Sequence, residues 1–253
     1  KIAVGHAWPN RGILYLFNCM FVNHWLQHFR RPDRSGELHA GRSGALYRAR
    51  RTVTSPKELR AILGRVLPTQ ASKVIDHIDK HCQTWIERCP FVVIASYNAA
   101  GEVDVSPKGD PPGFVKIVDH KTLAIPDRIG NHRGDTLANI LDNPRIGLMF
   151  VIPKRGEVLR VSGAAQIVLD TELLDRMIVN GHRPDLALLV RVEEAFFHCG
   201  KSMIRSRMWH PDQWGSIDGL PTYAQALRDH GQLSEPTATV EGMVAENEEK
   251  RLY

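Results

Sequence analysis

The chain has 253 residues, of which 43% are apolar, so it can bury a sizeable core in one domain or in two small ones. Its formal charge of +5 is distributed unevenly along the chain. Residues 1–51 carry nine Lys or Arg against two Asp or Glu, whereas residues 52–253 carry 24 against 26. The nearly neutral remainder argues against a nucleic-acid-binding surface over the whole protein. The four cysteines form no Cys-x-x-Cys pair, which is typical of free thiols in a reducing cytoplasm.

Residues 1–53 are predicted to form an atypical basic extension that is poorly ordered or docked on the surface. Its apolar run from Gly12 to Phe29 is interrupted by five polar residues, so it is too polar for a membrane span of about 20 apolar residues. The run also lacks the small-residue cleavage site of a secretory peptide. A role for this basic arm in membrane targeting or nucleic-acid binding is the alternative.

Two helices are predicted between residues 54 and 89. Ser55-Pro56-Lys57-Glu58 has the pattern of a capping box, in which Ser55 caps the helix and Glu58 reaches back to its start. A second helix is predicted from about Thr69 to Cys89, because apolar residues recur there at helical spacing.

The pattern after residue 90 is mainly that of antiparallel strands. Apolar or alternating runs predict strands at residues 91–96, 103–106, 114–118, 123–126, 146–152, 158–169 and 186–197. Short helices are predicted to start near residues 135, 171 and 199. Six or seven strands with few helices indicate a mainly β (α+β) fold, a small antiparallel barrel with flanking helices. Residues 216–253 are predicted to hold a C-terminal helix and an acidic tail, which is expected to be loose from residue 235 onward.

The most informative stretch lies between two of these predicted strands. It leaves a strand at Pro126, passes through a loop that contains Arg128 and Arg133, and enters a helix near Asp135. At such a place backbone N–H groups and the positive end of the helix dipole can point toward an anion, and guanidinium groups can form paired hydrogen bonds with its oxygens. The sequence therefore predicts a site for a phosphorylated cofactor or substrate.

Five motifs follow one another in a distinctive order. They are Ser106–Phe114, Ile125–Arg133, Asn143-Pro144-Arg145, Leu159–Gly163, and Phe197–Lys201 with Arg205-Ser206. This series resembles the pyridoxamine 5′-phosphate oxidase-like superfamily, and more narrowly its bacterial branch of FMN-dependent enzymes. The resemblance covers about residues 54–215. It implies an FMN-binding split β-barrel domain, normally a homodimer with the flavin in a cleft between the subunits.

The resemblance also implies which residues hold FMN. Asn131 and Arg133 stand where oxidase relatives carry polar and basic side chains that hold the FMN phosphate, and His132 is a further candidate. Asp127 stands where those relatives place a threonine near the flavin. The other candidate cofactor contacts are Ser106, Lys108, Arg128, Arg160, His198, Lys201 and Arg205.

Ordinary structural roles remain open for several of these residues. Arg128 and Arg133 could be solvated surface arginines, and Asn131 could cap the helix that follows it. Lys201 and Arg205 are four residues apart, so they share one helix face, which could equally be a solvated basic surface.

We therefore expect an FMN-dependent oxidoreductase of this superfamily that acts on an unidentified small molecule and accepts electrons from a substrate or a nicotinamide. The alternative is a non-catalytic protein that binds flavin, haem or a deazaflavin. The strand motif Arg-x-x-x-x-Lys of the true oxidases is reduced here to Lys108, so oxidation of pyridoxamine phosphate is not favoured. Neither a catalytic side chain nor a metal site is predicted, because the histidines lack metal-ligand spacing. A cytoplasmic homodimer without a membrane or nucleic-acid partner is expected.

Overall fold

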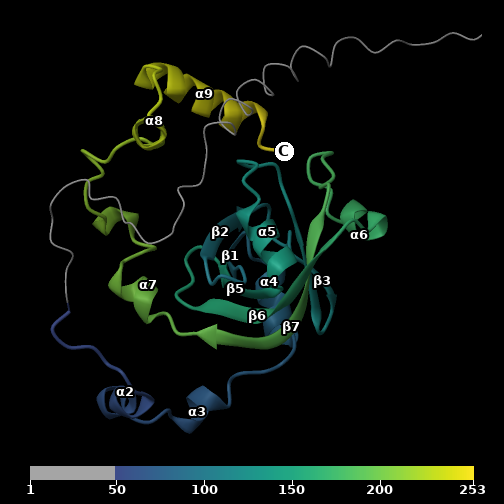
Figure 1. The fold of residues 1–253 in the computed structure, drawn as a ribbon. Helices are drawn as coiled ribbons and strands as arrows, with labels where there is room; N and C mark the ends of the chain where they lie inside the picture. The colour runs from purple at the N-terminus through teal and green to yellow at the C-terminus, as the bar shows by residue number, and fades with distance from the viewer. Residues whose placement is uncertain (1–48) are drawn as a thin grey trace, which may run out of the picture. The chain divides into compact units, whose positions relative to one another are not determined.

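The computed structural model describes residues 49–253, drawn in colour in Figure 1. These residues belong to two compact units that divide after Gly64. The predicted extension of residues 1–53 lies outside the described residues, except for its last five.

The first unit contains helix α2 (Pro56–Leu63). The Ser55 hydroxyl accepts a hydrogen bond from the Glu58 N–H, and the Glu58 carboxylate accepts one from the Thr54 N–H. Both bonds satisfy N–H groups that have no partner inside the helix. The predicted N-terminal cap is therefore confirmed.

The second unit, from Arg65 to Tyr253, contains all seven strands of the described residues in one antiparallel sheet. The strands are β1 (Phe91–Tyr97), β2 (Val103–Gly109), β3 (Lys116–Asp119), β4 (Thr122–Pro126), β5 (Arg145–Val151), β6 (Val158–Val168) and β7 (Ala187–His198). Their order across the sheet is β2-β1-β5-β6-β7-β4-β3. Over the described range the edge strands β2 and β3 do not pair, so the curved sheet stays open (Figure 1). The predicted antiparallel split barrel of six to seven strands with flanking helices is confirmed.

The helices of the second unit are short. They are α3 (Pro68–Ala71), α4 (Lys80–Glu87), α5 (Asp135–Asp142), α6 (Thr171–Asp175), α7 (Lys201–Arg205), the 3₁₀ helix η1 (Pro211–Gln213), α8 (Tyr223–Gly231) and α9 (Thr237–Lys250). No helix within residues 49–253 is long and apolar enough to cross a membrane.

The continuous helix predicted for residues 69–89 is wrong, because α3 and α4 are separated by residues 72–79. Within that gap Ile75 exchanges two backbone hydrogen bonds with Ala195 of β7, at 3.0 and 2.7 Å. Asp79 then caps α4 by accepting hydrogen bonds from the N–H groups of His81 and Cys82. The strand bridge and the cap satisfy backbone groups that a continuous helix would have paired internally.

The expectation of a loose tail from residue 235 is also wrong. Residues Thr237–Lys250 form α9, which packs against α8 and buries Val240. Helix α8 begins with a complete capping box between Thr222 and Gln225. The chain then returns to the barrel at Tyr253, whose hydroxyl donates a hydrogen bond to Asp110.

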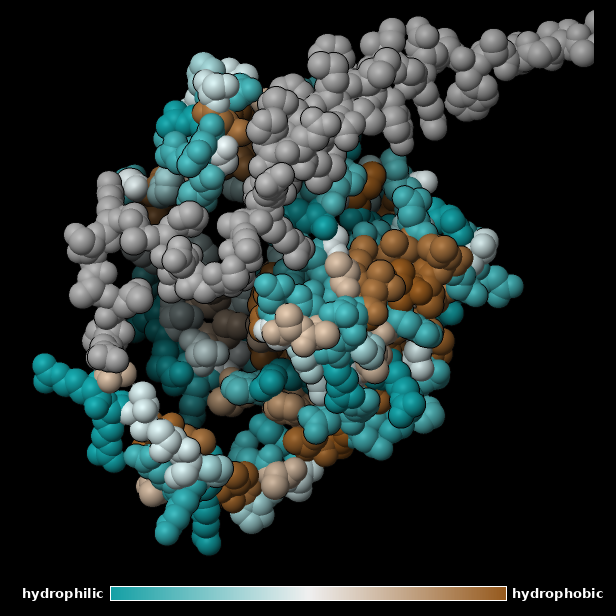
Figure 2. All heavy atoms as spheres, in the orientation of Figure 1, coloured by the Kyte–Doolittle hydropathy of each residue, from teal (hydrophilic) through white to brown (hydrophobic). Residues whose placement is uncertain are grey.

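The main core is formed by α4, α5 and the inward-facing residues of the strands. Alternate residues of β1 point inward, so Val92 and Ile94 are fully buried while their neighbours are not. Helix α4 adds Cys82 and Ile86, and burial raises the pKa of the Cys82 thiol to about 12. On the face drawn in Figure 2, apolar atoms gather in separate patches among polar ones.

One glycine is required where β6 meets β7. The register between these strands shifts at Gly163, and a Cβ atom on that residue would lie 2.0 Å from the carbonyl oxygen of Arg191. Such an approach is sterically impossible without moving one of the two strands.

We expect Gly163→Ala to lower the free energy of unfolding by about 3 kcal/mol, because the added methyl forces β6 and β7 apart. Urea denaturation followed by tryptophan fluorescence measures this loss. The matched control is Gly147→Ala in β5, where a Cβ atom would meet nothing within 4 Å. Equal stability of the two variants would contradict this account of the strand junction.

Candidate functional site

Strand β2 forms one wall of the candidate site. Its residues alternate between exposed and half-buried, so Asp104, Ser106 and Lys108 share one face. All three line a pocket of about 680 Å³, which is within the size range of about 300–1,000 Å³ typical of small-molecule sites.

The opposite wall is the loop between β4 and α5, residues 127–134, together with the first turn of α5. The loop turns sharply, since His132 and Gly134 both have positive φ angles of 57° and 67°. The side chain of Asn131 accepts a hydrogen bond from the N–H of Arg133 and so holds the turn. Asn131 therefore does not cap α5, whose N-cap is Gly134 without a side-chain hydrogen bond.

Three hydrogen bonds fix the position of α5 and hence of its N-terminus at the pocket. Thr136 donates to Asp104 of β2 at 2.6 Å, and Asn139 donates to Ser96 of β1 at 3.1 Å. At the other end of the helix the Asp142 carboxylate accepts from a backbone N–H of the turn between β1 and β2 at 2.6 Å. The positive end of the helix dipole is thereby held against the pocket.

Arg128 is the most constrained side chain of the pocket. Its guanidinium donates to Asp110 at 2.6 Å, to the carbonyl of Met177 at 2.7 Å and to the carbonyl of His182 at 3.4 Å. The Asp110 side chain is only 1% exposed, so this is a buried ion pair. Arg128 lines the pocket, but these bonds commit its guanidinium to joining three segments of the chain.

Tyr253 completes this cluster from the end of the chain. Its hydroxyl donates to the second oxygen of Asp110 at 2.8 Å, and its ring stacks on His182 with centroids 6.0 Å apart. The Arg128 guanidinium lies 5.7 Å from the ring centroid, within the range of a cation–π contact. The hydrogen bond to Asp110 raises the pKa of the Tyr253 hydroxyl. Tyr253 is therefore a wall of the pocket rather than part of a loose tail.

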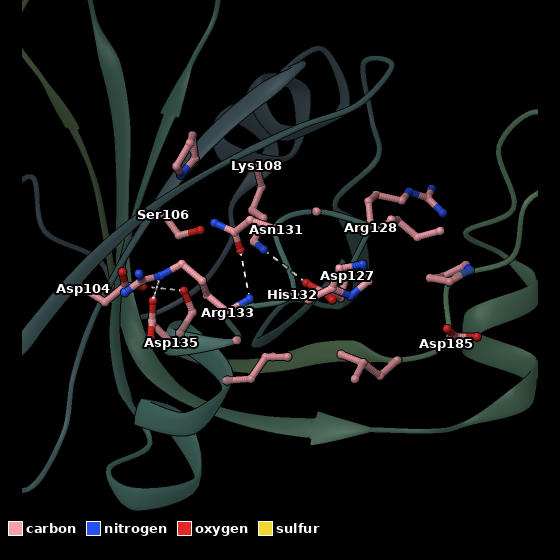
Figure 3. A pocket seen from close by; sticks show the side chains of 18 of the residues that line it. Asp104, Ser106, Lys108, Asp127, Arg128, Asn131, His132, Arg133, Asp135 and Asp185 are labelled. Atoms are coloured by element: carbon pink, nitrogen blue, oxygen red, sulfur yellow. Dashed lines mark hydrogen bonds and ion pairs between the residues drawn. The ribbon is translucent and has the colours of Figure 1, made fainter. Parts of the chain in front are cut away.

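Figure 3 shows the pocket with Asp104 and Arg133 toward one end and Arg128 and Asp185 toward the other. Seven of the predicted site residues lie around it: Ser106, Lys108, Asp127, Arg128, Asn131, His132 and Arg133. They come from β2 and from the loop after β4, which the fold brings together although about 20 residues separate them in the chain.

The remaining four predicted residues lie elsewhere in the second unit. Arg160 and His198 line a second hollow of about 440 Å³ on β1, β5, β6 and β7, where the Arg160 guanidinium lies 5.0 Å from the ring centroid of Phe196. Lys201 and Arg205 of α7 line neither hollow in the described part of the chain. The structure therefore does not bring these four residues to the pocket between β2 and the loop after β4 within one chain.

Several pocket residues have no recognisable signal in the sequence. Residues 182–186 line the pocket because β4 pairs with the start of β7, which places the loop before β7 beside the loop after β4. Only the order of the strands could have identified them. Asp110 does not line the pocket itself but holds Arg128 in place there, and Tyr253 reaches the pocket only through α8 and α9.

The sequence of residues 78–199 matches the family described as pyridoxamine 5′-phosphate oxidase. This part of the chain belongs to the pyridoxamine 5′-phosphate oxidase-like superfamily. The matched segment extends from just before α4 to the end of β7. It therefore contains both walls of the pocket, namely β2 and the loop before α5. Tyr253 lies beyond it. No curated protein sequence gives a significant match.

Solved structures with a similar strand arrangement include HupZ from Group A Streptococcus, which is 21% identical over 47% of this chain and 93% of its own, with a TM-score of 0.39. An FMN-binding protein from Syntrophomonas wolfei is 11% identical over 44% of this chain and 78% of its own, with a TM-score of 0.36. HutZ, the haem storage protein from Vibrio cholerae, is 12% identical over 48% of this chain and 94% of its own, with a TM-score of 0.35. The ligand of each of these proteins is a property of that protein alone, because a shared fold does not determine the ligand.

The cluster around Tyr253 predicts a pH-dependent stability. The neutral hydroxyl donates to Asp110, so its contribution is fully present below the ordinary tyrosine pKa of about 10 and is lost as the pH rises through the raised value. We expect Tyr253→Phe to be less stable than the wild type by about 1 kcal/mol at about pH 8. This difference should be smaller at about pH 11, because the unfolded state has by then lost most of its tyrosine proton.

Urea denaturation at the two pH values measures the difference between wild type and variant. The matched control is Tyr223→Phe, because Tyr223 is 67% exposed and has no hydrogen bond among the side-chain contacts found in residues 49–253. A difference that is the same at both pH values would contradict the assigned hydrogen bond.

Proposed function

We propose that the protein binds FMN with the phosphate at the loop between β4 and α5, and that it is an FMN-dependent oxidoreductase. One observation carries the proposal: Ser106 and Lys108 of β2, the loop 127–134 and the N-terminus of α5 converge on one pocket. Hydroxyl, amide and cationic donors beside a helix N-terminus suit a phosphate monoester. Membership of residues 78–199 in the superfamily supports the same assignment.

The residues present fit a phosphorylated flavin. Arg133 is 55% exposed and Lys108 is 24% exposed, so both cations remain accessible from the pocket. Asn131 accepts a hydrogen bond from the backbone N–H of Arg133 and so holds the turn that carries the Arg133 guanidinium. A bound flavin would accept and release electrons, while these side chains would anchor its phosphate and fix its orientation. We assign no acid or base role to any of them.

We propose that the protein is a homodimer. In this dimer the second hollow, on β1, β5, β6 and β7 of one subunit, faces the proposed phosphate pocket of the other. The hollow is lined by apolar groups from four strands and carries the predicted residues Arg160 and His198. An apolar hollow with a few polar groups suits an aromatic ring system. This arrangement would give both sets of predicted residues a place around one ligand. Sedimentation that finds only monomers would contradict it.

We also propose that the protein works in the cytoplasm on a small molecule or with a nicotinamide electron donor. Cys82, Cys89 and Cys199 are free thiols, which is typical of a reducing compartment. The burial of Cys82, which raises its pKa to about 12, also keeps that thiol protonated and unreactive.

Titration of the purified protein with FMN, followed by flavin fluorescence, tests the proposed site. We expect Arg133→Glu to weaken FMN binding by about 100-fold, because the change removes a donor and places a carboxylate beside the phosphate. Arg176→Glu is the matched control, since Arg176 is exposed at the end of α6 and lies outside the residues that line the pocket. Equal FMN affinity of both variants would overturn the assignment.

Stopped-flow mixing of the FMN complex with NADH or NADPH separates the enzyme from the non-catalytic alternative. The oxidoreductase predicts that the flavin absorbance bleaches and recovers in oxygen. A flavin that stays bound but is never reduced would favour a binding protein.

A further inference from the structure

The positive charges of the pocket are already paired within the chain. Among the described residues, each Lys or Arg that lines the pocket contacts a carboxylate: Lys108 with Asp127 at 3.1 Å, Arg133 with Asp135 at 2.6 Å, Arg128 with Asp110 at 2.6 Å and Arg183 with Asp175 at 2.6 Å. A phosphate that enters this pocket therefore competes with carboxylates for the same donors.

The pairs differ in how readily they can be exchanged. Asp110 is 1% exposed and also accepts from Tyr253, so separating it from Arg128 would leave a buried charge without a partner. Asp127 and Asp135 are 28% and 34% exposed, and the side chain of each accepts a single hydrogen bond among those found in the described residues. Pairs of this exposure are worth little, about 1 kcal/mol or less.

A phosphate dianion carries more charge and more acceptor oxygens than one carboxylate. It can therefore replace Asp127 on Lys108 and Asp135 on Arg133, with the N-terminus of α5 stabilising it further. The displaced Asp127 remains beside the pocket, where its negative charge opposes a bare anion. A ligand that carries a hydroxyl donor next to its phosphate can instead donate to the freed carboxylate.

We propose that Asp127 is a specificity-determining residue that holds Lys108 until a phosphate displaces it and then accepts a hydrogen bond from the ligand. The pocket would thereby select hydroxyl-bearing phosphate monoesters, such as the ribityl phosphate of FMN, over inorganic phosphate. This inference deepens the proposed function and rests on its placement of the phosphate.

Asp127→Asn tests the inference against a matched control, Asp185→Asn. Asp185 lines the same pocket and is exposed, but none of the ion pairs found in residues 49–253 involves it. Both variants remove one negative charge from the pocket, whereas only the first releases a cation. The probes are inorganic phosphate, followed by ³¹P NMR, and FMN, followed by fluorescence.

We expect Asp127→Asn to tighten inorganic phosphate binding by about threefold to tenfold relative to the wild type, and to tighten FMN binding by less, because the acceptor for the ligand hydroxyl is weakened. Asp185→Asn should change either affinity by less than about twofold. Equal effects of the two variants on phosphate, or an equal gain for phosphate and FMN, would overturn the inference. Absence of FMN binding by the wild type would instead refute the proposed function, while the phosphate titrations would still decide whether Asp127 is exchanged.

Discussion

The buried ion pair between Arg128 and Asp110 determines the shape of the pocket. Arg128 follows β4, Asp110 follows β2, and the same guanidinium donates to carbonyl groups of the segment between α6 and β7. Tyr253 adds the end of the chain to this junction. Four segments that are distant in sequence are thus held by one cation and one carboxylate in a place from which water is largely excluded. Such a pair is strongly destabilising to break, because either partner alone would be a buried uncompensated charge.

The pocket that results is not a simple basic cleft. Its cations are matched by carboxylates, so its net charge is small even though its donors are numerous. Long-range attraction of anions should therefore be weak and only mildly dependent on salt. Binding would instead depend on short-range exchange of partners and on the fixed dipole of α5. This arrangement separates the residue that shapes the site, Arg128, from Lys108 and Arg133, which can change partners.

Much of the fold could be predicted from the sequence, because its signals are local. Alternating residues identified the strands, and Ser55 with Glu58 identified the start of α2. The long helix predicted for residues 69–89 failed because apolar spacing cannot reveal that Ile75 bridges to Ala195, 120 positions along the chain. The same limit applies to the site. The loop 127–133 is a continuous motif and was identified, whereas Asp110 and Tyr253 join it only through tertiary contacts.

The central claim is that a phosphate monoester docks where the loop 127–134 meets the N-terminus of α5. Solution NMR of the ¹⁵N-labelled protein titrated with FMN tests it most directly, because backbone amides that receive a phosphate shift strongly. The account predicts that the largest amide shifts fall on residues 131–137, with smaller ones on β2. Shifts concentrated on other parts of the sheet, with residues 131–137 unchanged at saturating FMN, would contradict it.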